Sequence, residues 1–140
     1  MRAVIDRDQV TTEFFAYVAS YDLTSPKFQL KVDHSLRVAS LSDRIADSLG
    51  MQGQAKELAW LLGMLHDIGR FEQLRRYGTF RDGLSVDHAA LGADLLFKEG
   101  LLQRFITADA AAQEYQILEK AIRLHNAYLL PEDLTDTEYR

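Results

Sequence analysis

Apolar residues recur along most of the chain at the three- and four-residue spacing of a helix, and strand-like alternation is rare. This pattern predicts an all-α fold in which each helix buries one apolar face. The irregular, glycine-containing stretch 68–84 predicts a loop with one helical turn at most. We expect long helices and one short helix over 9–21, 28–49, 53–67, 86–99, 101–105 and 110–127.

Local signals support several of these boundaries. Gly50 and Gly100 follow two predicted helices and suit the left-handed conformation that ends a helix. Ser85 is expected to cap the helix over 86–99. The segment 58–65 is apolar on every side, which is typical of a central helix covered by its neighbours.

Length and composition limit the class of protein. The chain has 140 residues, a formal net charge of −5 and no cysteine, which fits one domain and excludes a disulfide framework, a zinc-finger cage and a thiol nucleophile. Apolar runs fall short of the ~20 residues of a membrane span, and the first residues do not resemble a signal peptide. We therefore expect a cytoplasmic protein without a membrane partner. Nucleic acid is not an expected partner, because no basic stripe is visible, and the oligomeric state is left open.

Each of the four histidines falls on the apolar face of a different predicted helix. His34, for example, shares its expected inward face with Leu41 and Ile45. If consecutive helices run antiparallel, the four positions meet at one end of a bundle. Any one of them alone would fit a hydrogen-bonded core residue, but four inward imidazoles at one level favour a metal site. These histidines are His34, His66, His88 and His125.

Asp67 adds a carboxylate directly after His66. Neighbouring helical residues diverge by about 100°, so both can bind one ion only where the helix ends. Gly69 permits such an irregular backbone. A solvated aspartate before a loop is the alternative interpretation.

These residues, in this order, resemble the HD-domain superfamily of metal-dependent phosphohydrolases. The resemblance covers about residues 28–130 and implies a single-domain helical bundle of the HD-domain type over 1–140, with five or more helices. The matching segments are Asp-His-Ser-Leu-Arg-Val-Ala over 33–39, Leu-His-Asp-Ile-Gly-Arg over 65–70, Asp-His-Ala-Ala-Leu-Gly over 87–92 and Ile-Arg-Leu-His-Asn over 122–126.

The resemblance implies one or two divalent transition metal ions. In such a site His34 and His66 bind the first ion, His88 and His125 bind the second, and Asp67 bridges both. Imidazoles and carboxylates without sulfur suit Fe, Mn, Co, Ni or Zn alike. A water activated by the metals would attack phosphorus, so the implied activity is hydrolysis of a phosphate ester of a nucleotide or other small phosphorylated metabolite.

Arginines near the motifs are candidates to bind the substrate phosphate. Arg70, three residues after Asp67, is the best candidate, because many members of the family carry a lysine or arginine there. Arg37 is a weaker one. Arg75 and Arg76 lie in the predicted loop that could cover the site, with ordinary surface charge as the alternative.

The remaining aspartates near the motifs have two interpretations. Asp33 and Asp87 each precede a histidine and could orient the ligands from behind, although helix N-terminal charge explains both as well. The family pattern ends with an aspartate on a later helix that has no match here, because Asp133 and Asp136 follow His125 too closely. Either a ligand is missing or, as we favour, the chain is a fragment that lacks its C-terminal helix or helices.

Two further functions are compatible with this ligand order. Some proteins of the HD fold use a di-iron centre as an oxygenase on small polyols or phosphonates. A catalytically degenerate domain could instead sense a nucleotide without turning it over. Iron content and oxygen consumption separate the oxygenase from the hydrolase.

Overall fold

The computed structural model describes residues 5–106 and 113–125, and every regular element in those ranges is helical. The predicted all-α fold is confirmed. The elements in chain order are α1 (Arg7–Val18), α2 (Pro26–Ser48), α3 (Gly53–Leu65), α4 (Gly69–Tyr77), the 3₁₀-helix η1 (Asp82–Leu84), α5 (His88–Ala93), the π-helical η2 (Asp94–Lys98), α6 (Leu102–Phe105) and α7 (Gln113–Leu124).

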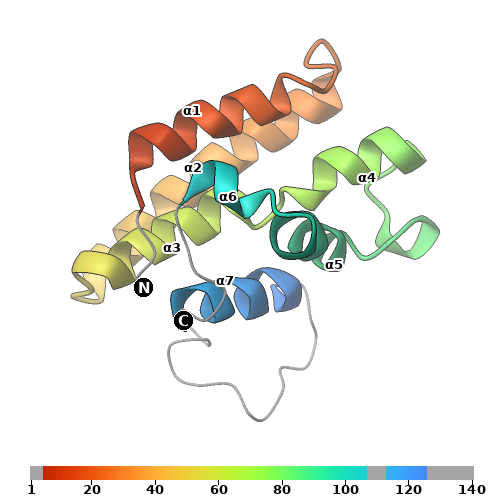
Figure 1. Cartoon of the computed structure of the whole chain (residues 1–140). Coiled ribbons are helices and arrows are strands. Elements are labelled where there is room, and N and C mark those ends of the chain that lie inside the picture. The colour runs from red at the N-terminus through yellow and green to blue at the C-terminus, as the bar shows by residue number, and fades with distance from the viewer. Residues whose placement is uncertain (1–4, 107–112, 126–140) are drawn as a thin grey trace.

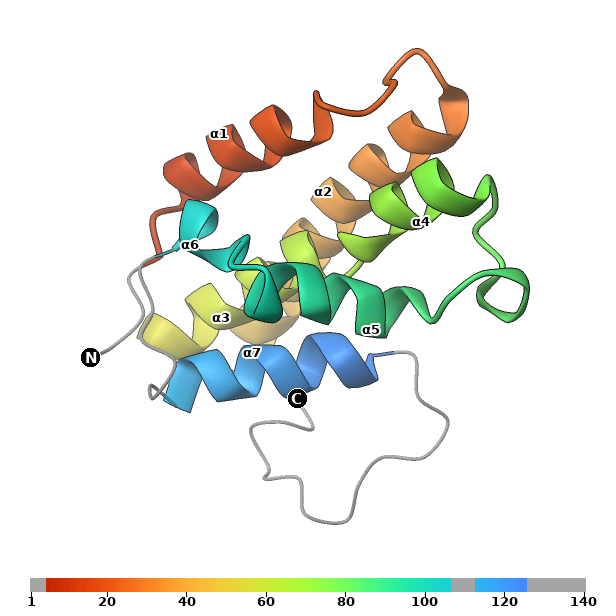
Figure 2. The same ribbon diagram turned by 45° about the vertical axis from the view of Figure 1, so that its right-hand side comes forward.

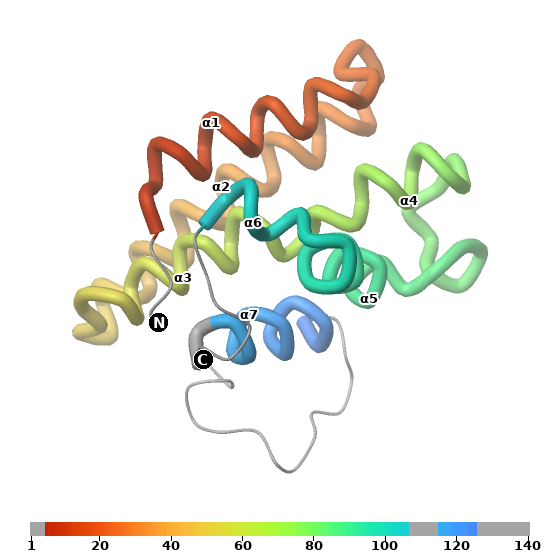
Figure 3. Tube along the Cα trace, in the orientation of Figure 1, coloured from red at the N-terminus to blue at the C-terminus, as the bar shows by residue number. Residues whose placement is uncertain are grey.

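The helices fold back on one another so that ends distant in sequence become neighbours. Helix α2 runs antiparallel to α1, and α3 returns along α2 (Figures 1 and 2). Helix α4 continues the path of α3 after a short turn, which the tube in Figure 3 traces. Helix α5 packs against both α4 and α7, and α7 also contacts α3. The end of α3, the start of α5 and the end of α7 are thereby brought together.

The core is apolar and draws on all of these layers. Phe14 of α1 meets Phe71 of α4 edge to face, with ring centroids 6.2 Å apart. Burying aromatic side chains of this size stabilises the fold by several kcal/mol in total, at about 1.5–3 kcal/mol each. Further fully buried side chains are Leu61, Met64, Leu65, Ile68, Leu96, Leu102, Phe105, Ile106, Leu118 and Ile122.

Two glycines permit the closest helix contacts. A Cβ on Gly63 of α3 would lie 2.7 Å from Ala39 Cα of α2, and one on Gly69 of α4 would lie 2.3 Å from the His88 carbonyl oxygen of α5. Neither glycine has a positive φ. The expectation that Gly69 serves an irregular backbone is therefore wrong, because its role is to leave room for α5.

Helix α4 is the main departure from the predicted elements. The stretch expected to be a loop contains a nine-residue helix, Gly69–Tyr77. Its polar residues hid the pattern, because Glu72 and Gln73 are buried together with Phe71 and Leu74. Their side chains have hydrogen-bonding partners, which makes a polar residue compatible with the buried face of a helix.

Helix ends agree only in part with the expected signals. Gly50 and Gly100 have φ values of 75° and 83° at the ends predicted for them. Ser85 does not cap the following helix, because α5 begins two residues later than expected. Asp87 is the cap, and its carboxylate accepts the Ala89 and Ala90 N–H groups at 3.0 and 3.3 Å.

The apolar residues of α2 and α3 are less buried than the sequence pattern predicts. Leu41 and Ile45 are 50 % and 58 % exposed among the described residues, so they do not form an inward face with His34. The buried face of α2 instead runs through Val32, Ser35, Ala39 and Ala46. Trp60 and Leu62 of α3 are only partly buried. None of the helices in the described ranges is both long enough and apolar enough to cross a membrane.

Candidate metal centre

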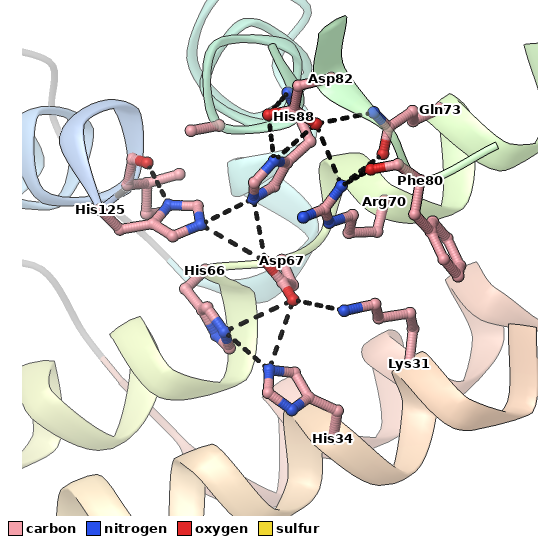
Figure 4. Close-up of polar contacts among 12 residues, drawn as sticks. Lys31, His34, His66, Asp67, Arg70, Gln73, Phe80, Asp82, His88 and His125 are labelled. Atoms are coloured by element: carbon pink, nitrogen blue, oxygen red, sulfur yellow. Dashed lines mark hydrogen bonds and ion pairs between the residues drawn. The ribbon is translucent and has the colours of Figure 1, made fainter. Parts of the chain in front are cut away.

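All four histidines point at one buried carboxylate (Figure 4). His34 comes from α2, His66 and Asp67 from the turn after α3, His88 from the first residue of α5, and His125 from the residue after α7. Asp67 is only 5 % exposed. The structure thus brings together the five side chains that the sequence pattern singled out.

The turn between α3 and α4 aims Asp67 inward. His66 still donates its backbone N–H to Leu62 O at 2.8 Å, as in an α-helix, whereas the Ile68 N–H bonds to Leu65 O, three residues back, at 3.1 Å. This tightening ends α3. Neighbouring side chains can then face the same point, with His66 Nε2 3.7 Å from Asp67 Oδ2.

The two carboxylate oxygens of Asp67 sort the imidazoles into two pairs. Oδ2 lies 3.4 Å from His34 Nε2, and these two residues with His66 form the first group. Oδ1 lies 3.3 and 3.4 Å from the Nε2 atoms of His88 and His125. Within the pairs the Nε2 atoms are 3.3 Å apart for His34 and His66 and 3.0 Å apart for His88 and His125. One carboxylate therefore joins two three-atom sites.

Three of the rings are oriented by an oxygen that accepts a hydrogen bond from Nδ1, on the side away from the centre. His66 Nδ1–H donates to Gly63 O at 2.7 Å, and His125 Nδ1–H donates to Ile122 O at 2.6 Å. His88 Nδ1–H donates to Asp82 Oδ2 at 2.8 Å. In the neutral ring, a proton on Nδ1 leaves the Nε2 lone pair free to bind a metal, whereas a second proton on Nε2 makes the ring a donor to Asp67.

Divalent metal ions fit this donor set. Atoms bound to one ion at about 2.0–2.2 Å lie about 2.9–3.6 Å from one another in tetrahedral or octahedral geometry. The spacings in the second group, 3.0 to 3.4 Å, fall within this range, and the first group reaches 3.7 Å. Nitrogen lone pairs that face each other at such distances repel unless a cation or a proton lies between them. The sulfur-free set does not choose among Fe, Mn, Co, Ni and Zn.

The pKa shifts show which groups are held neutral and which charged. Burial lowers the pKa values of His34 and His66, which keeps these rings neutral and able to bind a metal. Burial also opposes the charge of Asp67, but hydrogen bonds from His125 and His88 outweigh it and hold its pKa well below the ordinary value. For His125, burial is the largest single cause and lowers the pKa, but the bonds to Asp67 and Ile122 together with the charge of Asp67 outweigh it, and the net shift is upward.

Arg70 lies beside the centre but is partly engaged by the protein itself. Its Nη1 donates to Gln73 Oε1 at 2.9 Å, to Phe80 O at 2.5 Å and to Asp82 Oδ1 at 3.1 Å. Figure 4 shows the second amino group on the side that faces Asp67, without a dashed line. Arg70 thus fastens the connection between α4 and α5 and presents one N–H face to the histidines.

Asp82 is the functional residue that sequence reasoning missed. It accepts hydrogen bonds from His88 and also from Gln73 Nε2 at 2.9 Å. Burial is the largest single cause and raises its pKa, but the hydrogen bonds from His88 and Gln73 together with the charge of His88 outweigh it, and the net shift of the pKa is downward. Asp82 comes six residues before His88 in a segment without periodicity, so a spacing signal was lacking.

The other polar residues considered from the sequence lie elsewhere. Asp33 is exposed inside α2, beyond its first turn, and accepts a bond from Gln29, so helix N-terminal charge does not explain it. Asp87 is the cap of α5, and a helix-terminal role fits it better than ligand support. Arg75 and Arg76 pair with Glu72 instead of covering the centre. Of the remaining candidates, Arg37 is exposed on α2, and Asp133 and Asp136 lie outside the described residues.

A sequence profile of the HD domain matches residues 32–137. The chain belongs to the HD-domain family. All five residues that converge at the centre lie within this match, as do Arg70 and Asp82. HD domains bind divalent metals, and the two groups around Asp67 are able to hold them. Comparison with curated proteins and with solved structures found no significant match.

Proposed function

We propose that this HD-domain protein is a metal-dependent phosphohydrolase that cleaves a phosphate ester of a nucleotide or other small phosphorylated metabolite. The observation that carries the proposal is the buried Asp67 carboxylate, with a different histidine pair on each of its oxygens. Such a centre would hold two cations close together, which suits the displacement of an ester oxygen from phosphorus.

Divalent ions held there would supply positive charge for the phosphoryl oxygens and would lower the pKa of a water. The protein's own contribution is positional. Asp67 and the histidine pairs hold the charge, and the Nδ1 acceptors keep the rings from rotating. The centre needs no serine, threonine or cysteine nucleophile under this proposal.

Arg70 is proposed to bind the substrate phosphate through the amino group that faces Asp67. Removing one such preorganised donor costs about 10²-fold in kcat/KM, so Arg70→Ala should lose activity on that scale. Arg70→Lys should recover part of it, because charge survives without the planar fork. Elemental analysis should show unchanged metal content in both variants, since arginine is no ligand. Full activity of Arg70→Ala would contradict this role.

The function is tested by loading the purified protein with Mn, Fe, Co, Ni or Zn and measuring inorganic phosphate released from nucleoside monophosphates and p-nitrophenyl phosphate. We expect release that stops on chelation and is absent in Asp67→Asn. Oxygen consumption by an iron-loaded protein without phosphate release would support the oxygenase instead. Nucleotide binding without turnover would support a sensor.

We also propose that the protein acts in the cytoplasm, where nucleotides and phosphorylated metabolites of this kind are made, and that its partner is the small phosphorylated substrate itself. Fractionation of the producing cell, followed by an assay of the released phosphate in each fraction, tests the location. Activity confined to another compartment would contradict it.

A further inference from the structure

We propose that Lys31 is a second phosphate-binding residue and that, with Arg70, it makes the centre selective for phosphomonoesters over phosphodiesters. This inference rests on the proposed function and adds a residue and a substrate class to it. Lys31 lies one residue before the span that the HD-domain profile matches.

Lys31 reaches the centre from the same helix as His34. It lies three residues earlier on α2, close to one turn, so both side chains leave the helix on the same side. Its Nζ is 3.2 Å from Asp67 Oδ2, the oxygen that also faces the first histidine pair. The side chain is 17 % exposed. A lysine held this deeply is positioned by its surroundings, unlike a solvated surface lysine.

The Phe80 ring contacts the charged groups of both Lys31 and Arg70 on one side of the centre. Lys31 Nζ lies over the Phe80 ring at 5.3 Å from its centroid, and the Arg70 guanidinium carbon lies at 5.7 Å. The Phe80 carbonyl in turn accepts the bond from Arg70 Nη1. Because cation–π contact restrains both groups, the ammonium and the guanidinium are fixed beside the same carboxylate (Figure 4).

The charges around Asp67 favour an anion once metal is bound. Arg70 is balanced by Asp82, at 3.1 Å. Lys31 is paired with Asp67. Once divalent cations bind, the single negative charge of Asp67 must neutralise part of their charge as well as that of Lys31. A partly buried ammonium without a full counter-charge is costly. A phosphate group that enters the centre lowers this cost.

The number of cationic groups favours a terminal phosphate. A phosphomonoester carries up to two negative charges and three non-bridging oxygens, whereas a phosphodiester carries one charge and two such oxygens. With two oxygens facing the ions, a monoester leaves a third oxygen that Lys31 and Arg70 can share as hydrogen-bond donors. A diester leaves no further non-bridging oxygen for these two donors, and a buried donor without an acceptor is penalised.

The test compares Lys31→Gln with the wild type after metal loading. Inorganic phosphate, titrated by calorimetry, should bind about 10- to 100-fold more weakly, which is the effect of losing one hydrogen bond to a charged group. The kcat/KM for p-nitrophenyl phosphate should fall by a similar factor, whereas that for bis(p-nitrophenyl) phosphate should change less. Lys31→Arg should recover part of both losses.

Lys27→Gln is the matched control, because Lys27 is exposed on the same helix one turn earlier. It should leave phosphate binding and kcat/KM as in the wild type. Metal content and melting temperature, measured on all variants, separate a binding role from a structural one. Loss of metal from Lys31→Gln, or its full phosphate affinity, would overturn the inference.

The outcomes also separate this inference from the proposed function. One outcome is that the wild type binds phosphate and Lys31→Gln weakens that binding, but neither protein hydrolyses an ester. The proposed function is then overturned, while Lys31 remains a phosphate-binding residue. If the wild type hydrolyses esters and Lys31→Gln matches it, only the role of Lys31 is overturned. A metal-loaded wild type that neither binds phosphate nor hydrolyses any ester overturns both.

Discussion

Single side chains behind the ligands decide how the centre is oriented. His88 is held by Asp82, whose Oδ2 lies 2.8 Å from Nδ1, and Asp82 is held in turn by Gln73 and Arg70. A carboxylate in this position fixes the tautomer of the imidazole and raises its basicity toward a metal. Asp82 therefore supports His88, a member of the second group around Asp67, from behind its ring.

At this scale we expect Asp82→Asn to weaken binding of one ion by about 10- to 100-fold, because an amide is a poorer acceptor for the His88 N–H. The ion affected should be the one bound by His88 and His125. Equilibrium dialysis followed by elemental analysis measures it. Asp33→Asn, at an exposed position beside another ligand, is the control and should bind both ions normally. Equal losses in the two variants would contradict the assignment.

Among the elements, the contact of α4 with α5 positions Asp67 against His88. It depends on Gly69, whose missing side chain lets the His88 carbonyl and the Gly92 backbone approach. A Cβ would lie 2.6 Å from Gly92 N. Both neighbours are backbone atoms, so neither can rotate away, and the helices themselves would have to separate.

Gly69→Ala should therefore destabilise the protein by about 1–3 kcal/mol, the usual cost of overpacking, and should lower metal content as well. Thermal unfolding and elemental analysis check the two effects. The comparison is Gly83→Ala, where an added Cβ meets nothing within 4 Å, and which should leave both quantities close to the wild type. An unaltered Gly69→Ala would show that α4 and α5 can move apart freely.

A hydrogen-bond network away from the metal centre joins α4 to the end of α1 and the residues that follow it. The Tyr21 hydroxyl donates a hydrogen bond to Glu72 Oε1, with 2.8 Å between the oxygens, and the Tyr21 oxygen lies 2.8 Å from the Tyr17 hydroxyl oxygen. Arg75 and Arg76 also donate to Glu72. The bond from Arg75 is the largest cause that lowers the pKa of Glu72 to about 2.

Because folding lowers this pKa from 4.5, the folded state favours the ionised carboxylate. The resulting stability is present above the unfolded value and is lost as pH falls from about 5 to about 2. Glu72→Gln should lower the free energy of unfolding by about 1 kcal/mol at pH 7, since both arginines are solvent-exposed and the pairs are screened. Urea titrations across this pH range should show the difference shrink toward acid. A constant difference would mean that packing, not charge, is lost.

For the whole molecule, the centre links segments that are far apart along the chain. Its five side chains come from α2, from the turn after α3, from α5 and from the end of α7. A metal bound there crosslinks all four, and the unfolded chain offers no comparable site. Metal binding should therefore stabilise the fold as a unit.

Chelation should accordingly lower the melting temperature, and resupply of the metal should restore it. With free metal at 100 times the dissociation constant, the stabilisation is about 2.7 kcal/mol. Differential scanning fluorimetry with and without chelator measures the shift. Asp67→Asn should show little response to either treatment. The same melting temperature for loaded and metal-free wild type would argue against a crosslinking site.

Periodicity along the chain predicted the all-α fold and brought the four histidines to one place, and Asp67 was added by its position after His66 and by the resemblance to the HD domain. Each histidine lies on a different helix or directly after its end, and positions near alternating helix ends meet in an antiparallel bundle. The prediction that these residues meet therefore did not depend on the exact helix boundaries. They are His34, His66, Asp67, His88 and His125. His34 reached the centre although Leu41 and Ile45, expected on the same inward face, are exposed.

Tertiary structure alone decided which side chains support those ligands. Helix α4, the Asp82 contact to His88 and the Lys31 contact to Asp67 escaped prediction, the last because it joins residues 36 positions apart. Periodicity and capping depend on neighbours within a turn or two, so they predict where a helix runs and which face is apolar. A polar residue such as Gln73 becomes buried only when docked segments supply its partners. That information lies in the packing of the helices and not in any local stretch of the chain.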